Sequence, residues 1–320
     1  MTDHAELSEE RLPLNTTLGS RFLSFSSFIF FALGGYILSN AISLFLVMGI
    51  FGISLLQMAA LQQDPAGFDN AWLLLILIQV FAFTGAFLLT PIVYLRWIEH
   101  KPLASLNSNR QLSSRTLLAV ALLVIAFIPF NDLVIQWNNS ISLPKPLAPV
   151  EHWMQDMEEK AKILTQILTS FTSPFRLLVG LLVIAVMPAI GEELVFRGLL
   201  QNKLQSLTRN THVSVWVAAI LFSAIHLQFY GFIPRMLLGA MFGYLYAWSG
   251  SLWLPILAHF VNNSFTILMV YLYQQKLTEY DGENAALVSF PLALVSLAIT
   301  IGLLYYIKTY YKTHRSAPDA

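Results

Sequence analysis

The sequence predicts an all-α, polytopic membrane protein with about eight transmembrane helices and one interfacial amphipathic helix. Hydrophobic residue types make up 56% of the 320 residues, and only 11% are Asp, Glu, Lys or Arg, against about 25% in a typical soluble domain. Apolar runs of roughly 20 residues, the length that crosses a bilayer as a helix, recur along the chain. This composition excludes an ordinary soluble enzyme, a nucleic-acid binder and a disordered chain. Because the chain has no Cys, disulfides, thiolate metal sites and a Cys nucleophile are excluded as well.

The first apolar run, residues 22–63, contains no charged residue and is longer than one span requires. The simpler interpretation is one tilted helix with an interfacial extension. A tight hairpin that turns at Gly34-Gly35 and Asn40 is the alternative. The other spans are predicted from the apolar runs at residues 71–95, 116–137, 177–200, 213–230, 232–248, 252–273 and 285–307.

Residues 149–171 differ from the spans, because apolar side chains recur there at steps of three and four while charged side chains fill the other face. Val150 and Trp153 belong to the apolar face, and Glu158 and Lys162 belong to the polar face. This pattern predicts an amphipathic helix that lies on the outer membrane surface. Such a helix would be an anchoring strap between two spans or, alternatively, a lid over a site.

The Lys and Arg residues set the expected orientation, since cytoplasmic loops carry the excess of positive charge. With eight spans, both termini lie on one side of the membrane, and we expect that side to be the cytoplasm. Residues 1–21 and 308–320 would be cytoplasmic tails of a membrane domain at 22–307. The side of the termini carries Arg11, Arg21, Arg96, Lys101, Arg110, Arg115, Lys203, Arg209, Lys308, Lys312 and Arg315, and the other side carries Lys145, Lys160, Lys162, Arg176, Arg235 and Lys276.

Three charged residues lie deep inside one apolar run: Glu192, Glu193 and Arg197. A charge at the bilayer centre costs on the order of 3 kcal/mol, so an intramembrane ionisable residue indicates function. Glu193 and Arg197 are four residues apart on one helix face and are expected to form an ion pair. Glu192 is turned by about 100° from Glu193, which leaves its carboxylate free for chemistry.

Further polar residues lie in later predicted spans. His226 falls in the fifth span, and His259 and Asn263 share one face of the seventh because they are four residues apart. Phe222, four residues before His226, is most simply a packing neighbour. Each of these residues alone has an ordinary explanation as a partner between packed helices. Packing between helices does not explain why an unpaired Glu, two His and an Asn occur together on three spans.

An activated water is the chemistry that these residues favour. Glu192 would be the general base, and His226 would share the water or its proton. His259 and Asn263 would donate hydrogen bonds to the oxyanion of a tetrahedral intermediate, which describes peptide-bond hydrolysis without a covalent intermediate.

Two alternatives stay open at this point. The first is a zinc site of Glu192, His226 and His259, although the sequence contains no H-E-x-x-H spacing. The second is a non-hydrolytic protein, either an immunity or scaffold protein or a proton-coupled carrier, because intramembrane Glu and His also build proton relays.

The ordered set Glu192-Glu193-x-x-x-Arg197, Phe222-x-x-x-His226 and His259-x-x-x-Asn263 resembles the three motifs of the CAAX prenyl protease and bacteriocin-processing family, also called CPBP or Abi. The eukaryotic relatives of this family are the type II Ras-converting CAAX endopeptidases. The resemblance covers about Pro188 to Ser264, and the sequence before about residue 170 adds little to it.

The resemblance implies an eight-helix intramembrane glutamic endopeptidase with its site facing the cytosolic side and a catalytic core at about residues 175–273. It implies no metal or other cofactor, and as partners it implies a peptide or membrane-associated protein substrate and the lipid bilayer, without nucleic acid. The compact chain favours a bacterial plasma membrane. The implied catalytic residues are Glu192, His226, His259 and Asn263, and the implied supporting residues are Glu193, Arg197 and Phe222.

Overall fold

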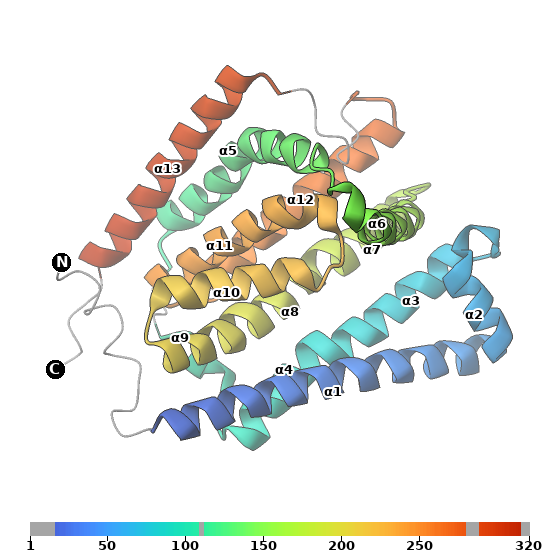
Figure 1. Ribbon diagram of the computed structural model, residues 1–320, viewed down its shortest axis with the longest axis horizontal. Helices are drawn as coiled ribbons and strands as arrows, with labels where there is room; N and C mark the ends of the chain where they lie inside the picture. Colours follow the sequence, from blue (N-terminus) through green and yellow to red (C-terminus); the bar gives the residue numbers. More distant parts are fainter. Residues whose placement is uncertain (1–16, 109–111, 280–287, 315–320) are drawn as a thin grey trace.

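The computed structural model describes residues 17–108, 112–279 and 288–314, and within these ranges every regular element is a helix (Figure 1). The all-α membrane fold is therefore confirmed. Of the described helices, six are long and apolar enough to cross a membrane. These six are α1 (Leu18–Phe51), the helix at Ala71–Ile98, α5 (Ser114–Asn139), the helix at Pro174–Thr208, α12 (Trp253–Gln274) and α13 (Phe290–Thr313).

The other two predicted spans are shorter or more polar. The fifth corresponds to α10 (Thr211–Ala224), which has 14 residues, and the sixth to α11 (Phe232–Ser249), which has 18 residues and carries Arg235 in its first turn. Arg11, Arg110 and Arg315, which entered the orientation count, lie outside the described residues, as do most of the predicted tails.

The first apolar run forms one long helix and a short second one. Gly34 and Gly35 lie inside α1, which continues for 34 residues to Phe51 and ends where Gly52 adopts a left-handed conformation with φ of 64°. A capping box of Ser54 and Gln57 then starts α2 (Leu55–Gln63). The hairpin alternative is thus wrong, because the chain turns after Phe51 and not at the glycine pair. Gly35 instead allows α1 to approach Thr90 closely.

The second span is an antiparallel partner of α1 (Figure 1). It consists of α3 (Ala71–Phe83), a π-helical segment at Thr84–Leu89, α4 (Thr90–Val93) and a second π-helical segment at Tyr94–Ile98. The first π-helical segment directly precedes Thr90-Pro91, where proline cannot donate a backbone hydrogen bond. A 3₁₀ turn at Leu103–Leu106 leads towards α5.

The last span packs along α5. The Tyr311 hydroxyl lies 3.2 Å from the Thr116 hydroxyl, and Ile307 and Tyr311 are buried in the apolar cluster that α5 and α13 share. These contacts explain why α13 continues to Thr313, six residues beyond the predicted end at 307. They also place the end of α13 beside the beginning of α5.

The central helix carries the three intramembrane charges and is longer than predicted. It is built from α7 (Pro174–Gly180), a π-helical segment at Leu181–Val186, α8 (Met187–Glu193), a π-helical segment at Leu194–Gln201 and α9 (Asn202–Thr208). The first π-helical segment again directly precedes a proline, Pro188. π-helical turns inside α-helices are frequent at functional sites.

The span predicted at residues 213–230 ends earlier than expected. Helix α10 stops at Ala224, and Leu227 has a positive φ of 53° that a helix cannot accommodate. His226 therefore lies in the connection before the 3₁₀ turn Phe229–Gly231, and its prediction inside a span is wrong.

The amphipathic segment forms α6 (Ala148–Leu168), after a 3₁₀ turn at Lys145–Leu147, and none of its residues is fully buried. Trp153 packs against Phe229 in a tilted arrangement with ring centroids 5.1 Å apart, and the Trp72 indole donates to the Leu168 carbonyl over 3.2 Å. The predicted helix is confirmed, and it is held near both of its ends.

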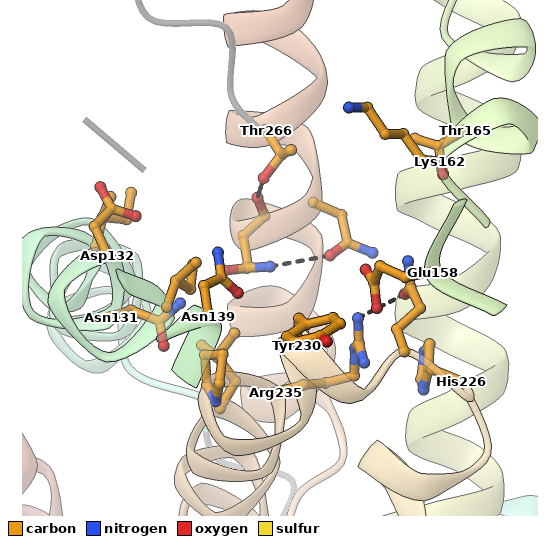
Figure 2. A pocket seen from close by; sticks show the side chains of 18 of the residues that line it. Asn131, Asp132, Asn139, Glu158, Lys162, Thr165, His226, Tyr230, Arg235 and Thr266 are labelled. Carbon is orange, nitrogen blue, oxygen red and sulfur yellow. Dashed lines mark hydrogen bonds between the residues drawn. The ribbon is translucent and has the colours of Figure 1, made fainter. Parts of the chain in front are cut away.

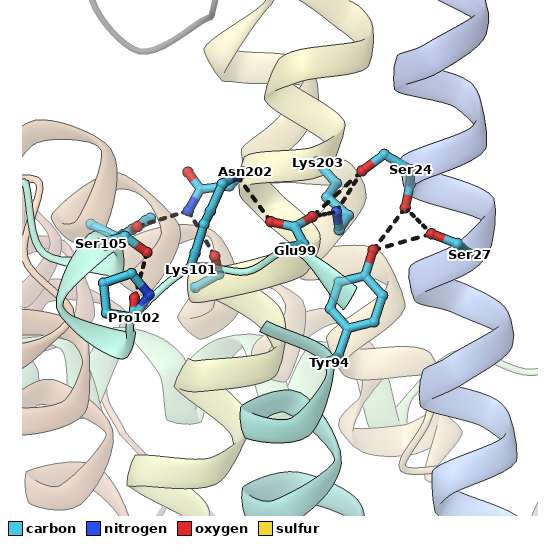
Figure 3. A network of polar contacts seen from close by, with 11 residues as sticks. Ser24, Ser27, Tyr94, Glu99, Lys101, Pro102, Ser105, Asn202 and Lys203 are labelled. Atoms are coloured by element: carbon cyan, nitrogen blue, oxygen red, sulfur yellow. Dashed lines mark hydrogen bonds and ion pairs between the residues drawn. The ribbon is translucent and has the colours of Figure 1, made fainter. Parts of the chain in front are cut away.

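A polar network joins three helices at the opposite end of the bundle (Figure 3). Glu99 accepts hydrogen bonds from Lys203 and from Lys101, and Lys203 also donates to the Ser24 hydroxyl over 2.8 Å. Burial alone would raise the pKa of Glu99, but the hydrogen bonds and charges of Lys203 and Lys101 outweigh it and hold that pKa below its ordinary value. The network fixes the end of the central helix against α1.

Candidate active site

A cavity of about 1040 Å³ lies between α5, α6, α8, α11, α12 and the connection after α10 (Figure 2). All four predicted catalytic residues line it, and so does Phe222. Asp132 and Asn139 of α5 and Glu158 and Lys162 of α6 contribute to its polar wall. Residues of the three motifs, which are far apart in the sequence, therefore line one common cavity.

Glu193 is the acceptor at the centre of a buried cluster beneath this cavity. Its Oε1 atom accepts a hydrogen bond from Arg197 Nη1 over 2.6 Å and lies 2.8 Å from His259 Nδ1. Both Glu193 and Arg197 are buried, with side-chain exposures of 0% and 1%. The ion pair expected from their spacing is present, and it reaches across to a third helix through His259.

Arg197 has further partners that hold its guanidinium in the protein interior. Its Nη2 atom donates to the Gly239 carbonyl over 2.9 Å, and its guanidinium lies over the rings of Phe222 and Phe242 at 4.7 and 5.5 Å. Cation–π contacts of a desolvated Arg are attractive because the ring face is electron-rich. Phe222 is thus a packing neighbour of Arg197 as well as of His226.

Glu192 is placed differently from Glu193, as the helical geometry predicts. His259 Nε2 lies 3.9 Å from Glu192 Oε2, and Arg197 forms its ion pair with Glu193 instead. Gly191 brings this part of α8 close to the second span, where a Cβ atom would lie 2.6 Å from the Phe83 ring. The Glu192 carboxylate therefore faces the cavity with no ion pair to an Arg or Lys among the described residues.

His226 is oriented by its own helix end. Its Nδ1 atom lies 2.8 Å from the Phe222 carbonyl, which is one of the last carbonyls of α10 that lack a helical partner. A carbonyl oxygen can only accept, so Nδ1 carries the proton and Nε2 is left as an acceptor. Although His226 and Glu192 line the same cavity, the described contacts include no direct hydrogen bond between them.

His259 and Asn263 share one face of α12, as their spacing predicts. Phe242 stacks on the His259 ring with centroids 5.3 Å apart, and Glu193 holds Nδ1, so Nε2 points to Glu192. The Asn263 amide nitrogen donates to the Ile184 carbonyl over 3.1 Å and has a second N–H available. Sequence alone left the depth of His259 open, and the contact with Glu192 places the two residues at the same level.

The zinc alternative requires Glu192, His226 and His259 to converge on one point. In the described part of the chain no three His, Cys, Asp or Glu residues are close enough to hold a metal ion. The described residues thus present no preassembled set of three zinc ligands.

One lining residue entered the sequence interpretation only in the count of basic residues on the side opposite the termini. Arg235 lies in the first turn of α11 and faces the cavity near Glu158 and His226 (Figure 2). Its place three residues inside the apolar run 232–248 was the signal that could have identified it.

The cavity lies towards one end of α5. Helix α5 begins beside the end of α13 and ends at Asn139, which lines the cavity together with α6. The residues of α5 that line the cavity, Phe127 to Asn139, thus belong to the half of α5 that lies farther from the end of α13.

Comparison with known proteins agrees with the motifs. Residues 174–265 match the sequence model of the family described as type II CAAX prenyl endopeptidase Rce1-like. The resemblance is confirmed over this stretch. Residues 174–265 contain all seven residues named from the three motifs.

Two proteins of Bacillus subtilis (strain 168) are similar to part of the chain. One is named "Uncharacterized protein YpbD" and is 34% identical over 77 residues, which is 23% of this chain and 36% of that protein. The other is named "Putative membrane peptidase YdiL" and is 27% identical over 89 residues, which is 28% of this chain and 36% of that protein. The similarity thus spans about a third of the length of each relative. No solved structure matches this chain.

Proposed function

We propose that this protein is an intramembrane endopeptidase that hydrolyses a peptide bond near the membrane with a water molecule activated by Glu192. The observation that carries this proposal is that the Glu192 carboxylate faces a cavity of about 1040 Å³, while the neighbouring Glu193 forms the ion pair with Arg197. The match to a membrane endopeptidase family over residues 174–265 supports the same activity.

In the proposed reaction, Glu192 removes a proton from water as the water oxygen attacks the carbonyl carbon of the peptide bond. His226 Nε2 accepts a hydrogen bond from the same water and orients it. The tetrahedral intermediate then collapses, the C–N bond breaks, and the proton held by Glu192 passes to the departing amine. The products are an amine and a carboxylic acid, which releases its proton to solvent and leaves as a carboxylate, with no covalent enzyme intermediate.

The developing oxyanion needs donors on the other side of the scissile bond. We assign this role to His259 Nε2 and to the second N–H of Asn263. The Glu193 carboxylate holds His259 Nδ1 and stabilises positive charge on the ring, so that Nε2 can carry a proton as well. Arg197 and Phe222 keep Glu193 and His259 in place through the contacts described above.

The decisive variant is Glu192→Gln in purified protein reconstituted in lipid bilayers. Loss of a general base lowers the turnover number by about 10²- to 10⁴-fold. Glu159→Gln is the matched control, because Glu159 is exposed on α6 and does not line the cavity. If Glu192→Gln cleaves a peptide library as fast as the wild type, Glu192 is not the base.

We also propose that the reaction needs no metal ion. The expected result is that EDTA and 1,10-phenanthroline leave the rate of peptide cleavage unchanged. Loss of cleavage on chelation, restored by added Zn²⁺ but not by Mg²⁺, would instead identify a metallopeptidase.

The excess of Lys and Arg on the side of the termini leads us to propose that the cavity opens to the outer side of the membrane. Because the chain has no Cys, single-cysteine variants need no removal of native thiols. A membrane-impermeant maleimide applied to intact cells is expected to label His152→Cys on α6 and to leave Thr313→Cys unlabelled until the cells are opened. The reverse pattern would place the cavity on the cytoplasmic side.

A further inference from the structure

Arg235 is a cation in the cavity that the proposed hydrolysis does not use. Its Nη2 atom donates to Gln228 Oε1 over 2.7 Å, whereas its Nη1 atom is buried and has no hydrogen-bond partner among the described residues. A buried donor of a charged group that lacks a partner is costly, because the group has lost its bonds to water. An unused guanidinium donor in a cavity therefore indicates a ligand that accepts a hydrogen bond.

Arg235 differs in this respect from Arg197, the other Arg near the site. Arg197 is saturated by the Glu193 carboxylate, the Gly239 carbonyl and two aromatic rings. Arg235 interacts electrostatically with Glu158 and Glu192, but neither carboxylate forms an ion pair with it in the described structure. Its guanidinium is therefore not paired with a carboxylate by direct contact among the described residues.

We propose that Arg235 binds a carboxylate group of the substrate, so that peptides carrying this group are positioned for cleavage beside Glu192. The planar guanidinium presents paired N–H donors that match a carboxylate, and the Nη1 donor is the one left open. The anionic group of the substrate would thereby be held at the start of α11, in the cavity that Glu192 also lines. This inference rests on the proposed function and names the substrate feature that the site selects.

The carboxylate has two sources in a peptide, the chain terminus and an Asp or Glu side chain. The experiment therefore uses four versions of one cleaved peptide: a free C-terminus or a C-terminal amide, each with Asp or Asn near the scissile bond. For the wild type we expect kcat/KM to be about 10- to 100-fold higher for the peptide that carries the recognised carboxylate. Whichever arm shows the preference identifies the source.

Arg235→Gln is expected to abolish this preference, mainly through KM, while the uncharged peptide is cleaved at a rate close to that of the wild type. Arg235→Lys retains the charge and is expected to keep part of the preference. Arg176→Gln is the matched control, because Arg176 stacks on Trp72 at 4.5 Å and does not line the cavity. If Arg235→Gln slows all four peptides equally, Arg235 acts on Glu192 and not on the substrate, and the inference is wrong.

Binding separates this inference from the proposed function. Fluorescence anisotropy of the labelled peptides with the Glu192→Gln variant measures affinity without cleavage. Wild-type cleavage with no preference among the four peptides overturns the role of Arg235 and leaves the endopeptidase intact. If the wild type cleaves none of the peptides, the proposed endopeptidase activity is wrong. Anisotropy then compares the affinities of the four peptides for the wild type and for Arg235→Gln. A preference for the carboxylate peptides that only the wild type shows would still support carboxylate binding by Arg235, and equal affinities would refute it.

Discussion

The buried ion pair between Glu193 and Arg197 allows stability and activity to be separated. Glu193→Gln keeps an oxygen that can accept from His259 but removes the charge opposite Arg197. Arg197→Met keeps much of the side-chain volume but leaves the Glu193 carboxylate without its guanidinium. Because both side chains are at most 1% exposed, each single variant leaves one buried charge without its ion-pair partner.

Breaking a buried pair on one side costs about 3 to 5 kcal/mol, whereas removing both charges is often nearly neutral. We therefore expect each single variant to lose about that amount of unfolding free energy, and the double variant to lie within about 2 kcal/mol of the wild type. The cleavage rate of the double variant is not expected to recover in the same way. The double variant still lacks the negative charge that stabilises a protonated His259, so its cleavage rate stays at least about 100-fold below that of the wild type.

Unfolding free energies are measured by equilibrium denaturation in mixed micelles with increasing sodium dodecyl sulfate, followed by circular dichroism. Cleavage rates are measured on the same preparations. Lys101→Met is the control, because Lys101 is 59% exposed in its pair with Glu99 and an exposed pair contributes at most about 1 kcal/mol. A double variant as unstable as the sum of the two singles, or a double variant with wild-type activity, would refute the reasoning.

Two further predictions concern packing and pH. Gly191→Ala places a Cβ atom 2.6 Å from the Phe83 ring and is expected to cost about 1 to 3 kcal/mol, measured by the same denaturation, whereas Gly302→Ala meets no atom within 4 Å and serves as the control. The pKa of Glu99 lies below its ordinary value of 4.5 in the folded protein, because Lys203 and Lys101 outweigh the effect of burial. The stability that this pair contributes is thus present above the unfolded pKa and is lost as the pH falls through the folded pKa. Wild type should lose more unfolding free energy than Glu99→Gln on acidification from neutral pH to below 4.5, and equal losses would contradict the role assigned to this pair.

Composition and periodicity were enough to predict the fold class, because a bilayer restricts spans to long apolar helices. They could not predict where α10 ends. Residues 225–230 are mostly apolar or aromatic and read as helix, whereas the turn depends on a positive φ at Leu227 that no local composition signals. Likewise, Pro91 and Pro188 by themselves did not reveal that the turns before them, Thr84–Leu89 and Leu181–Val186, are π-helical.

Spacing within one helix predicted the contact between Glu193 and Arg197, because residues four apart share a face. The contact between Glu193 and His259 joins two helices and needed the fold. Arg235 was missed because it lies close to the predicted start of a span. That its side chain faces the cavity depends on the tertiary structure and cannot be seen in the sequence. The chemical roles of the site residues stay predictions until the variants are measured.

The central helix joins the cavity to the polar network at the far end of the bundle (Figure 3). Lys203 follows Glu192 by eleven residues, with the π-helical segment Leu194–Gln201 between them. Each helical residue adds about 1.5 Å and 100°, so the loss or gain of one residue there would turn one end away from its partners. We therefore expect natural relatives that retain both Glu192 and the Lys203 network to differ within this segment by substitutions, and not by insertions or deletions.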